Sequence, residues 1–178
     1  MKRITGSVVL LVALALSLPG QAKAQFIWFG VGGSFPTGDF KEYANTGFLT
    51  SAGVGFPVAE KVSIYGEGFF GQNNHETEGD KTTPFGFMAG AEVDLAPDAA
   101  GVYFFGGLGV MVHKFSSDQF ESDSSSGLAF EGGGGVDFPL NDNVNGWVEG
   151  RFMNASIESE NTSFLGALAG ISVNVGSY

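Results

Sequence analysis

The chain has 178 residues, which suits one domain, and it is rich in glycine and phenylalanine, with 29 and 18 copies. Three of its 8 basic residues precede residue 25, so the remainder carries 5 basic against 19 acidic groups. The resulting net charge of −14 excludes binding to a phosphate backbone. The chain has no cysteine, which excludes disulfides and thiolate chemistry.

The first 24 residues have the order of a secretory signal peptide. Lys2 and Arg3 give a positive start, an apolar run follows over residues 8–18, and residues 22–24 fit the small-x-small cleavage rule. The run is shorter than the roughly 20 residues that a spanning helix needs. We therefore expect cleavage before Gln25 and not an N-terminal membrane anchor.

Residues 25–178 are expected to form one β domain of eight strands. Apolar residues alternate with small or polar ones in eight stretches, each close to the ~9–11 residues that a tilted strand needs to cross a bilayer. The stretches are residues 27–35, 48–56, 62–71, 85–95, 102–115, 128–138, 144–153 and 164–175.

The connections between these stretches alternate in character. Residues 36–47, 72–84, 116–127 and 157–163 are polar, acidic and mostly long, whereas residues 57–61, 96–101 and 139–143 are short. Short turns on one side and longer loops on the other are typical of up-and-down barrels in the outer membrane. An even strand count places both chain ends on the short-turn side.

The two faces of each stretch differ in chemistry. Over residues 62–71, for example, Val62, Ile64 and Phe70 share one face, whereas Tyr65 and Glu67 share the other. An uncharged face suits lipid, but it also suits the core of a soluble sandwich or lipocalin-like barrel.

Two details favour lipid. The polar face carries Gly, Ser, aromatic residues and isolated acids, which suits a crowded narrow lumen better than a water-exposed surface. Aromatic residues also mark both ends of the apolar face, as expected where a barrel meets the two lipid interfaces. They are Phe56, Phe138 and Tyr178 at the short-turn end and Phe48, Phe70 and Phe85 at the other end.

An internal repeat supports two four-stranded halves. Residues 56–70 match residues 138–152 without a gap, at an offset of 82 residues. Each copy has a Phe-Pro turn followed by an aromatic residue and a Glu-Gly pair. Convergent turn design is the alternative, because Pro, Asn and Asp favour turns in any protein.

The export signal, the eight alternating stretches, the repeated Phe-Pro turn and the aromatic C-terminus resemble the outer-membrane β-barrel domain family, which includes the OmpA transmembrane domain and OmpX-type proteins. The resemblance implies a closed eight-stranded antiparallel up-and-down transmembrane barrel. It also implies that the last strand carries the signal read by the barrel-insertion machinery. The residues that match this signal are Gly170, Val173, Val175 and Tyr178.

Charged residues fall on the predicted inner face. Arg151 is the only arginine after residue 24, and pairing about the 139–143 turn places Glu131 roughly opposite it. Because unpaired charges in a narrow lumen are costly, we expect a hydrogen-bonded ionic cluster. Its candidate members are Glu67, Glu92, Glu131, Glu149 and Arg151.

No catalytic, cofactor or metal site is expected. The only histidines are His75, in an acidic loop, and His113, which faces inward with Ser116 and Ser117 just beyond it. No compact nucleophile and base pair is present, and the acidic loops lack the spacing of known metal-binding loops.

The sequence therefore predicts a non-enzymatic, monomeric outer-membrane protein with a structural or surface-interaction role and a lumen filled by side chains. A narrow channel or carrier for small molecules is the alternative, and a lipid-modifying enzyme is a third. Expected partners are outer-membrane lipid, lipopolysaccharide and the barrel-insertion machinery, with termini in the periplasm and long loops outside.

Overall fold

The computed structural model describes residues 25–95, 101–118, 122–157 and 160–175. The expected signal peptide, residues 1–24, and Tyr178 of the expected assembly signal lie outside these residues.

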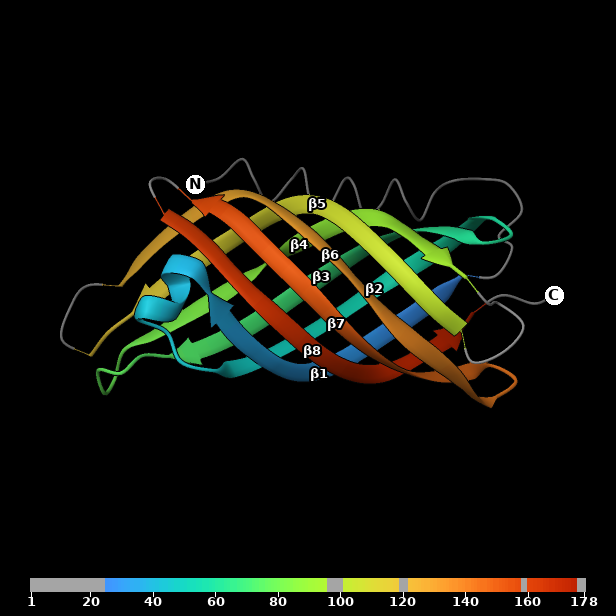
Figure 1. The fold of residues 1–178 in the computed structure, drawn as a ribbon, viewed down its shortest axis with the longest axis horizontal. Coiled ribbons are helices and arrows are strands. Elements are labelled where there is room, and N and C mark those ends of the chain that lie inside the picture. Colours follow the sequence, from blue (N-terminus) through green and yellow to red (C-terminus); the bar gives the residue numbers. More distant parts are fainter. Residues whose placement is uncertain (1–24, 96–100, 119–121, 158–159, 176–178) are drawn as a thin grey trace.

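Eight strands form a closed barrel in which each strand pairs antiparallel with its neighbour in the chain and β1 pairs with β8 (Figure 1). This confirms the predicted fold. Closure leaves no unpaired sheet edge, which a barrel needs if its backbone groups are to be satisfied in lipid. The elements are β1 (Phe26–Thr37), η1 (Gly38–Glu42), β2 (Gly47–Ala59), β3 (Val62–Asn74), β4 (Lys81–Asp94), β5 (Gly101–Ser116), β6 (Asp123–Asn141), β7 (Val144–Ile157) and β8 (Glu160–Asn174).

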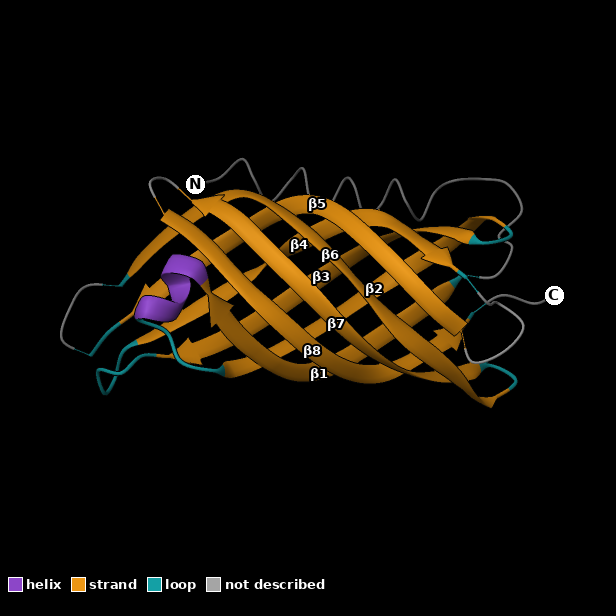
Figure 2. Ribbon diagram, in the orientation of Figure 1, coloured by secondary structure: helices purple, strands orange, loops and turns teal. Residues whose placement is uncertain are grey.

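The barrel has two different ends. We call "loop end" the end with connections 38–46, 75–80, 117–122 and 158–159, and "turn end" the end with connections 60–61, 95–100 and 142–143. The start of β1 and the end of β8 pair with each other at the turn end. The short 3₁₀ helix η1 lies at the loop end (Figure 2).

The described residues contain no helix that is long and apolar enough to cross a membrane.

The strands are longer than the sequence predicted, and the loops are correspondingly shorter. The stretch predicted at residues 128–138 is part of the 19-residue strand β6, and the loop predicted at 72–84 shrinks to 75–80. Backbone pairing continues into polar sequence, as between Phe115 and Asp123. Apolar alternation detects only the part of a strand that faces apolar surroundings, so it missed these extensions.

The two copies of the sequence repeat have the same backbone irregularity. The β2–β3 register shifts between Pro57 and Ala59, and the β6–β7 register shifts between Pro139 and Asn141, which are the equivalent positions. In the second copy, the Asn141 side chain accepts hydrogen bonds from the backbone N–H groups of Asn143 and Val144, both at 3.0 Å. The repeat is therefore present in the structure as well as in the sequence. It sets the strand registers that position the lumen side chains.

Candidate functional site

The middle of the lumen holds a buried arginine surrounded by glutamates. Arg151 on β7 has only 2% of its side chain exposed, and it reaches Glu67 on β3, Glu131 on β6 and Glu149 on its own strand. Both terminal nitrogens contact Glu67, Nη1 lies 3.1 Å from Glu131 Oε2, and Nε donates to Glu149 Oε1 at 2.6 Å. Because β3 and β7 are four strands apart in a closed barrel of eight, the arginine bridges opposite walls.

Aromatic side chains complete this cluster. Tyr65 donates to Glu131 at 2.7 Å and Tyr103 donates to Glu149 at 3.1 Å, while the Arg151 guanidinium lies 5.2 Å from the centre of the Phe105 ring. Hydrogen bonds and ring contacts of this kind offset part of the cost of removing the charges from water. The cluster has three carboxylates and one guanidinium, so its stability depends on that single positive charge.

Of the five predicted cluster residues, the structure brings four together. Glu92 is not among the ion-pair partners of Arg151 in the described part of the chain, and it lies further toward the turn end, lining a cavity there. The register differs from expectation as well: Arg151 pairs with Gly133, and Glu131 pairs with Met153. The two-residue shift preserves the face, so both side chains still point into the lumen.

The repeat explains part of the cluster and also why its aromatic members were missed. Glu67 and Glu149 occupy equivalent positions of the two copies, whereas Arg151 stands where the first copy has Phe69. The aromatic members lie at inward-facing positions of their strands, so side-chain alternation places them in the lumen: they are Tyr65, Tyr103 and Phe105. Parity alone, however, does not say which inward residues of different strands meet at one height.

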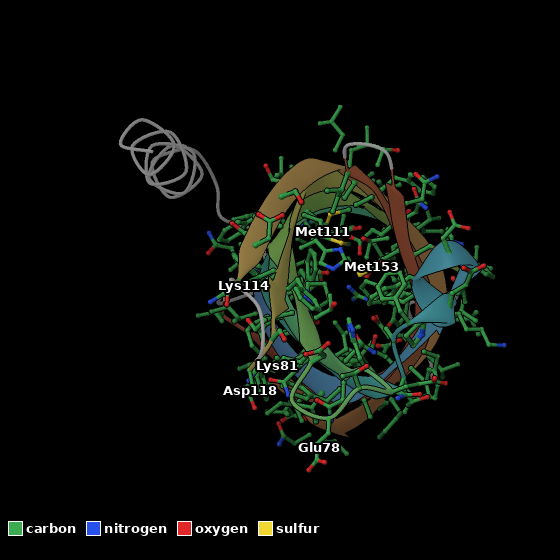
Figure 3. All side chains as sticks on the ribbon, turned by 90° about the vertical axis from the view of Figure 1, so that its left-hand side faces the viewer. Glu78, Lys81, Met111, Lys114, Asp118 and Met153 are labelled. Atoms are coloured by element: carbon green, nitrogen blue, oxygen red, sulfur yellow. The ribbon has the colours of Figure 1, made fainter. Side chains whose placement is uncertain are left out.

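An apolar layer fills the loop end of the lumen. Phe40 on η1 is fully buried, with its ring centre 6.5 Å from that of Phe164 and 5.7 Å from that of His113. The view into the loop end shows Met111 and Met153 inside the barrel (Figure 3). The inner face therefore carries more than the expected glycine, serine, aromatic and acidic residues: Leu49, Met111 and Met153 are fully buried, as is the aromatic Phe164.

A chain of hydrogen bonds links both histidines. Thr82 Oγ1 lies 2.8 Å from His75 Nε2 and 3.2 Å from His113 Nε2, and His113 Nδ1 lies 2.7 Å from Thr162 Oγ1. Partial burial lowers the pKa of His75, while the nearby Asp80 carboxylate opposes that effect. Within the described segments, no carboxylate hydrogen-bonds either ring, so the acid–base arrangement of a catalytic triad is not assembled here.

The turn end of the lumen is hollow. A cavity of about 330 Å³ is lined by Glu92, Asp94 and Asp137 among others, with Trp28 and Trp147 on its wall. Among the described residues, no group of three or more His, Asp or Glu side chains is arranged to hold a metal ion.

The outer face is apolar over a height that fits a membrane. On β4 and just beyond it, the outward residues run from Phe85 to Leu95, and the ten steps between them span about 33 Å along the strand, or about 25 Å along the barrel axis at the usual tilt. Exposed aromatic side chains mark both ends, with Phe48, Phe70 and Phe85 toward the loop end and Phe104 and Phe138 toward the turn end. A soluble barrel would instead bury its apolar face inside.

A closed antiparallel barrel with an apolar belt outside and charged groups inside is an outer-membrane-type β-barrel. The chain belongs to the outer membrane protein beta-barrel domain family, whose model matches residues 8–176. No curated protein matches the sequence at a significant level.

Solved structures share the fold at low sequence identity. Neisserial surface protein A is 13% identical, with a TM-score of 0.64 over 84% of this chain and 96% of that one. Ail, the attachment invasion locus protein of Yersinia pestis, is 17% identical, with a TM-score of 0.54 over 85% and 99% of the two chains. OprG from Pseudomonas aeruginosa is 15% identical, with a TM-score of 0.53 over 89% and 99%.

One glycine that faces the lumen, Gly107, and one that faces outward, Gly150, provide a test of lumen packing. A Cβ added at Gly107 would lie 2.7 Å from Tyr65 Oη and 3.0 Å from Glu131 Oε1, whereas one added at Gly150 meets nothing within 4 Å. We expect Gly107→Ala to lower the free energy of unfolding by about 1–3 kcal/mol, the usual cost of overpacking, and Gly150→Ala to change it by less than about 0.5 kcal/mol. Urea unfolding of the two variants in lipid vesicles measures the difference, and equal effects would contradict the packing described here.

Proposed function

We propose that this protein is a non-enzymatic barrel of the bacterial outer membrane with a structural or surface-interaction role, and that its own side chains close its lumen to solutes. The observation that carries this proposal is the filling of the lumen at two successive levels. The apolar layer beneath the fully buried Phe40 fills the loop end, and the cluster around Arg151 bridges the walls below it. An eight-stranded barrel has an interior just wide enough for such side chains to fill.

The difference between the two ends of the barrel supports an orientation in the membrane. In barrels of this type the short turns and both chain ends face the periplasm. We therefore assign the turn end to the periplasm and the loop end to the cell exterior. The β8 residues Gly170 and Val173, together with Val175 just after the strand, would be presented to the barrel-insertion machinery during assembly, and the folded chain would act as a monomer.

The charge of the loop end indicates the kind of surface partner. Connections 38–46, 75–80, 117–122 and 158–159 contain eight acidic residues and one lysine. One solved structure of Ail is a complex with the heparin analogue sucrose octasulfate, a polyanion. The acidic connections of this chain would repel such a ligand, so we propose a surface partner that is basic or uncharged.

A narrow channel or carrier is the second candidate, and the cavity at the turn end favours it. Its volume of about 330 Å³ is enough to hold a small molecule. The lipid-modifying enzyme has less support, because His113 contacts two threonines and lacks a hydrogen-bonded carboxylate in the described residues.

Conductance separates the two candidates. We expect the purified protein, folded in detergent and inserted into planar bilayers, to give no steady single-channel current, because the layers at Phe40 and Arg151 leave no continuous water path. A heat-dependent mobility shift on a gel, together with recovery in the outer-membrane fraction, serves as the control for folding and location. A reproducible open-channel current from correctly folded protein would contradict the closed lumen and favour the channel.

A further inference from the structure

Aromatic rings line the wall of the cavity at the turn end. Every odd-numbered strand contributes at least one ring: the residues are Phe26 and Trp28 on β1, Tyr65 on β3, Tyr103 and Phe105 on β5, and Trp147 on β7. Glycines on even-numbered strands leave the space that these rings occupy. A Cβ added at Gly135 would lie 2.6 Å from Tyr103 Oη, and one added at Gly170 would lie 2.5 Å from a ring carbon of Trp147. The rings therefore lie along the wall and leave the centre of the cavity open.

The angles between the rings fit this arrangement. Two strands of eight make a quarter turn of a closed barrel, so rings that lie flat on the wall two strands apart should be nearly perpendicular. Trp28 and Tyr65 are inclined at 75°, and Tyr65 and Phe105 at 82°, with ring centres 6.0 and 6.2 Å apart. These angles indicate that the rings turn their faces toward the barrel axis, and the face of an aromatic ring attracts a cation. The Arg151 guanidinium, 5.2 Å from the centre of the Phe105 ring, already makes such a contact.

The charges on the cavity wall are predominantly negative. Of the two basic residues, Arg151 is already surrounded by three glutamates, and Lys61 stands exposed on the 60–61 connection. Six carboxylates line the cavity: Glu60, Glu67, Glu92, Asp94, Asp137 and Glu149. With every group ionised, the lining has an excess of four negative charges, so it repels anions and attracts cations.

Glu92 is the carboxylate best placed to meet a cation. It pairs directly with Phe105 on β5, so an aromatic ring lies beside it on the same face of the sheet. In the described ranges, no ion pair within 4.0 Å involves Glu92 or Asp137. The carboxylates of Asp94, Asp137 and Glu149 are close enough to Glu92 to repel its negative charge. A cation bound beside Glu92 would offset this repulsion.

A hydrogen-bond donor on the same wall is unsatisfied. Trp147 is only 5% exposed, and its indole N–H has no hydrogen-bond partner among the described residues. Buried polar groups normally have a partner, and those that lack one call for an explanation. Because this side chain lines the cavity, an oxygen atom on a bound ligand would supply the missing acceptor.

We propose that the turn-end cavity binds a small organic cation, a protonated or quaternary amine, with its ammonium group beside Glu92 and its carbon atoms against the aromatic rings. The volume of about 330 Å³ is at the lower end of the range for small-molecule sites, which fits a ligand of this kind. A metal ion fits less well, because the described residues hold no group of three side chains arranged to ligate one. The site retains its ligand and does not conduct it, since the layers at Arg151 and Phe40 lie beyond the cavity.

Choline is the probe for this site, and the two tryptophans of the chain report on its occupancy because Trp28 and Trp147 both line the cavity. The folded protein is titrated with choline in maltoside micelles and followed by tryptophan fluorescence and calorimetry. We expect saturable binding of one choline per chain. Glu92→Gln should weaken it about tenfold, as expected for the loss of one charged partner, and Trp28→Leu about fivefold. Dimethylbutanol, the uncharged analogue with carbon in place of nitrogen, should bind at least about tenfold more weakly than choline.

The matched control is Glu42→Gln, which removes one exposed carboxylate from η1 at the opposite end of the barrel. It should leave choline binding unchanged, and a heat-dependent gel shift shows that each variant is folded. The site is overturned if the folded, unmodified protein does not bind choline, if Glu92→Gln binds it equally well, or if the uncharged analogue binds as tightly. An equal loss in Glu42→Gln would also overturn it, because binding would then reflect only the overall negative charge. None of these outcomes bears on the proposed function, which conductance and fractionation test separately.

Discussion

Replacing Arg151 with Met is expected to lower the free energy of unfolding by about 3–5 kcal/mol, the range found when one partner of a buried ion pair is removed. The variant leaves Glu67, Glu131 and Glu149 facing one another with no counter-charge, and each is buried. Urea unfolding in lipid vesicles, followed by tryptophan fluorescence or gel mobility, gives the change in midpoint.

The glutamates provide the controls for this result. Adding Glu67→Gln and Glu131→Gln to Arg151→Met removes two of the unbalanced charges, so the triple variant should be more stable than Arg151→Met alone. Glu92→Gln changes an inward carboxyl group that is not an ion-pair partner of Arg151, and it should change the free energy of unfolding by less than about 0.5 kcal/mol. An unchanged midpoint in Arg151→Met would show that the cluster does not stabilise the fold.

Replacing Phe40 with Ala should release η1 from the barrel mouth. Phe40 is fully buried against Phe164 and His113, and losing a buried phenylalanine side chain typically costs about 3–5 kcal/mol. A cost of about 3 kcal/mol raises the fraction of molecules with η1 detached about 100-fold. Trypsin cleavage after the exposed Lys41, measured in detergent micelles, should accelerate by a similar factor when opening is faster than cleavage.

The control for this experiment is Phe48→Ala, which removes an outward phenylalanine that is 46% exposed. It should leave cleavage after Lys41 unchanged. In Phe40→Ala the barrel itself should stay folded, because the eight-strand ladder does not pass through η1. A cleavage rate equal to that of the unmodified protein would mean that Phe40 does not anchor the helix.

The lumen clusters show where prediction from the sequence ended. Side-chain alternation along the strands correctly placed Arg151 and the glutamates in the lumen. The predicted cluster, however, included Glu92 and omitted Tyr65. Parity fixes the face of a residue and not its height along the barrel axis. Height depends on the stagger between strands, which the bulges at Pro57 and Pro139 help to set.

The loop end was the hardest part to predict. The ring of Phe40 belongs to a connection, where the side-chain alternation of a strand gives no information. The hydrogen bonds from His75 through Thr82 to His113 and Thr162 join residues of three strands and one connection. The nearest of these residues in sequence are seven apart, so no local motif marks the arrangement.

The sequence by itself determined the number of strands, the face on which each residue lies and the alternation of short and longer connections. It did so because a strand in a bilayer must present apolar residues to lipid at every second position. Only the tertiary structure decided how far the strands extend, which glutamates meet Arg151 and how Phe40 enters the barrel mouth. These features depend on contacts between residues that are distant in sequence and brought to one height by barrel closure and stagger, which alternation along a single strand does not encode.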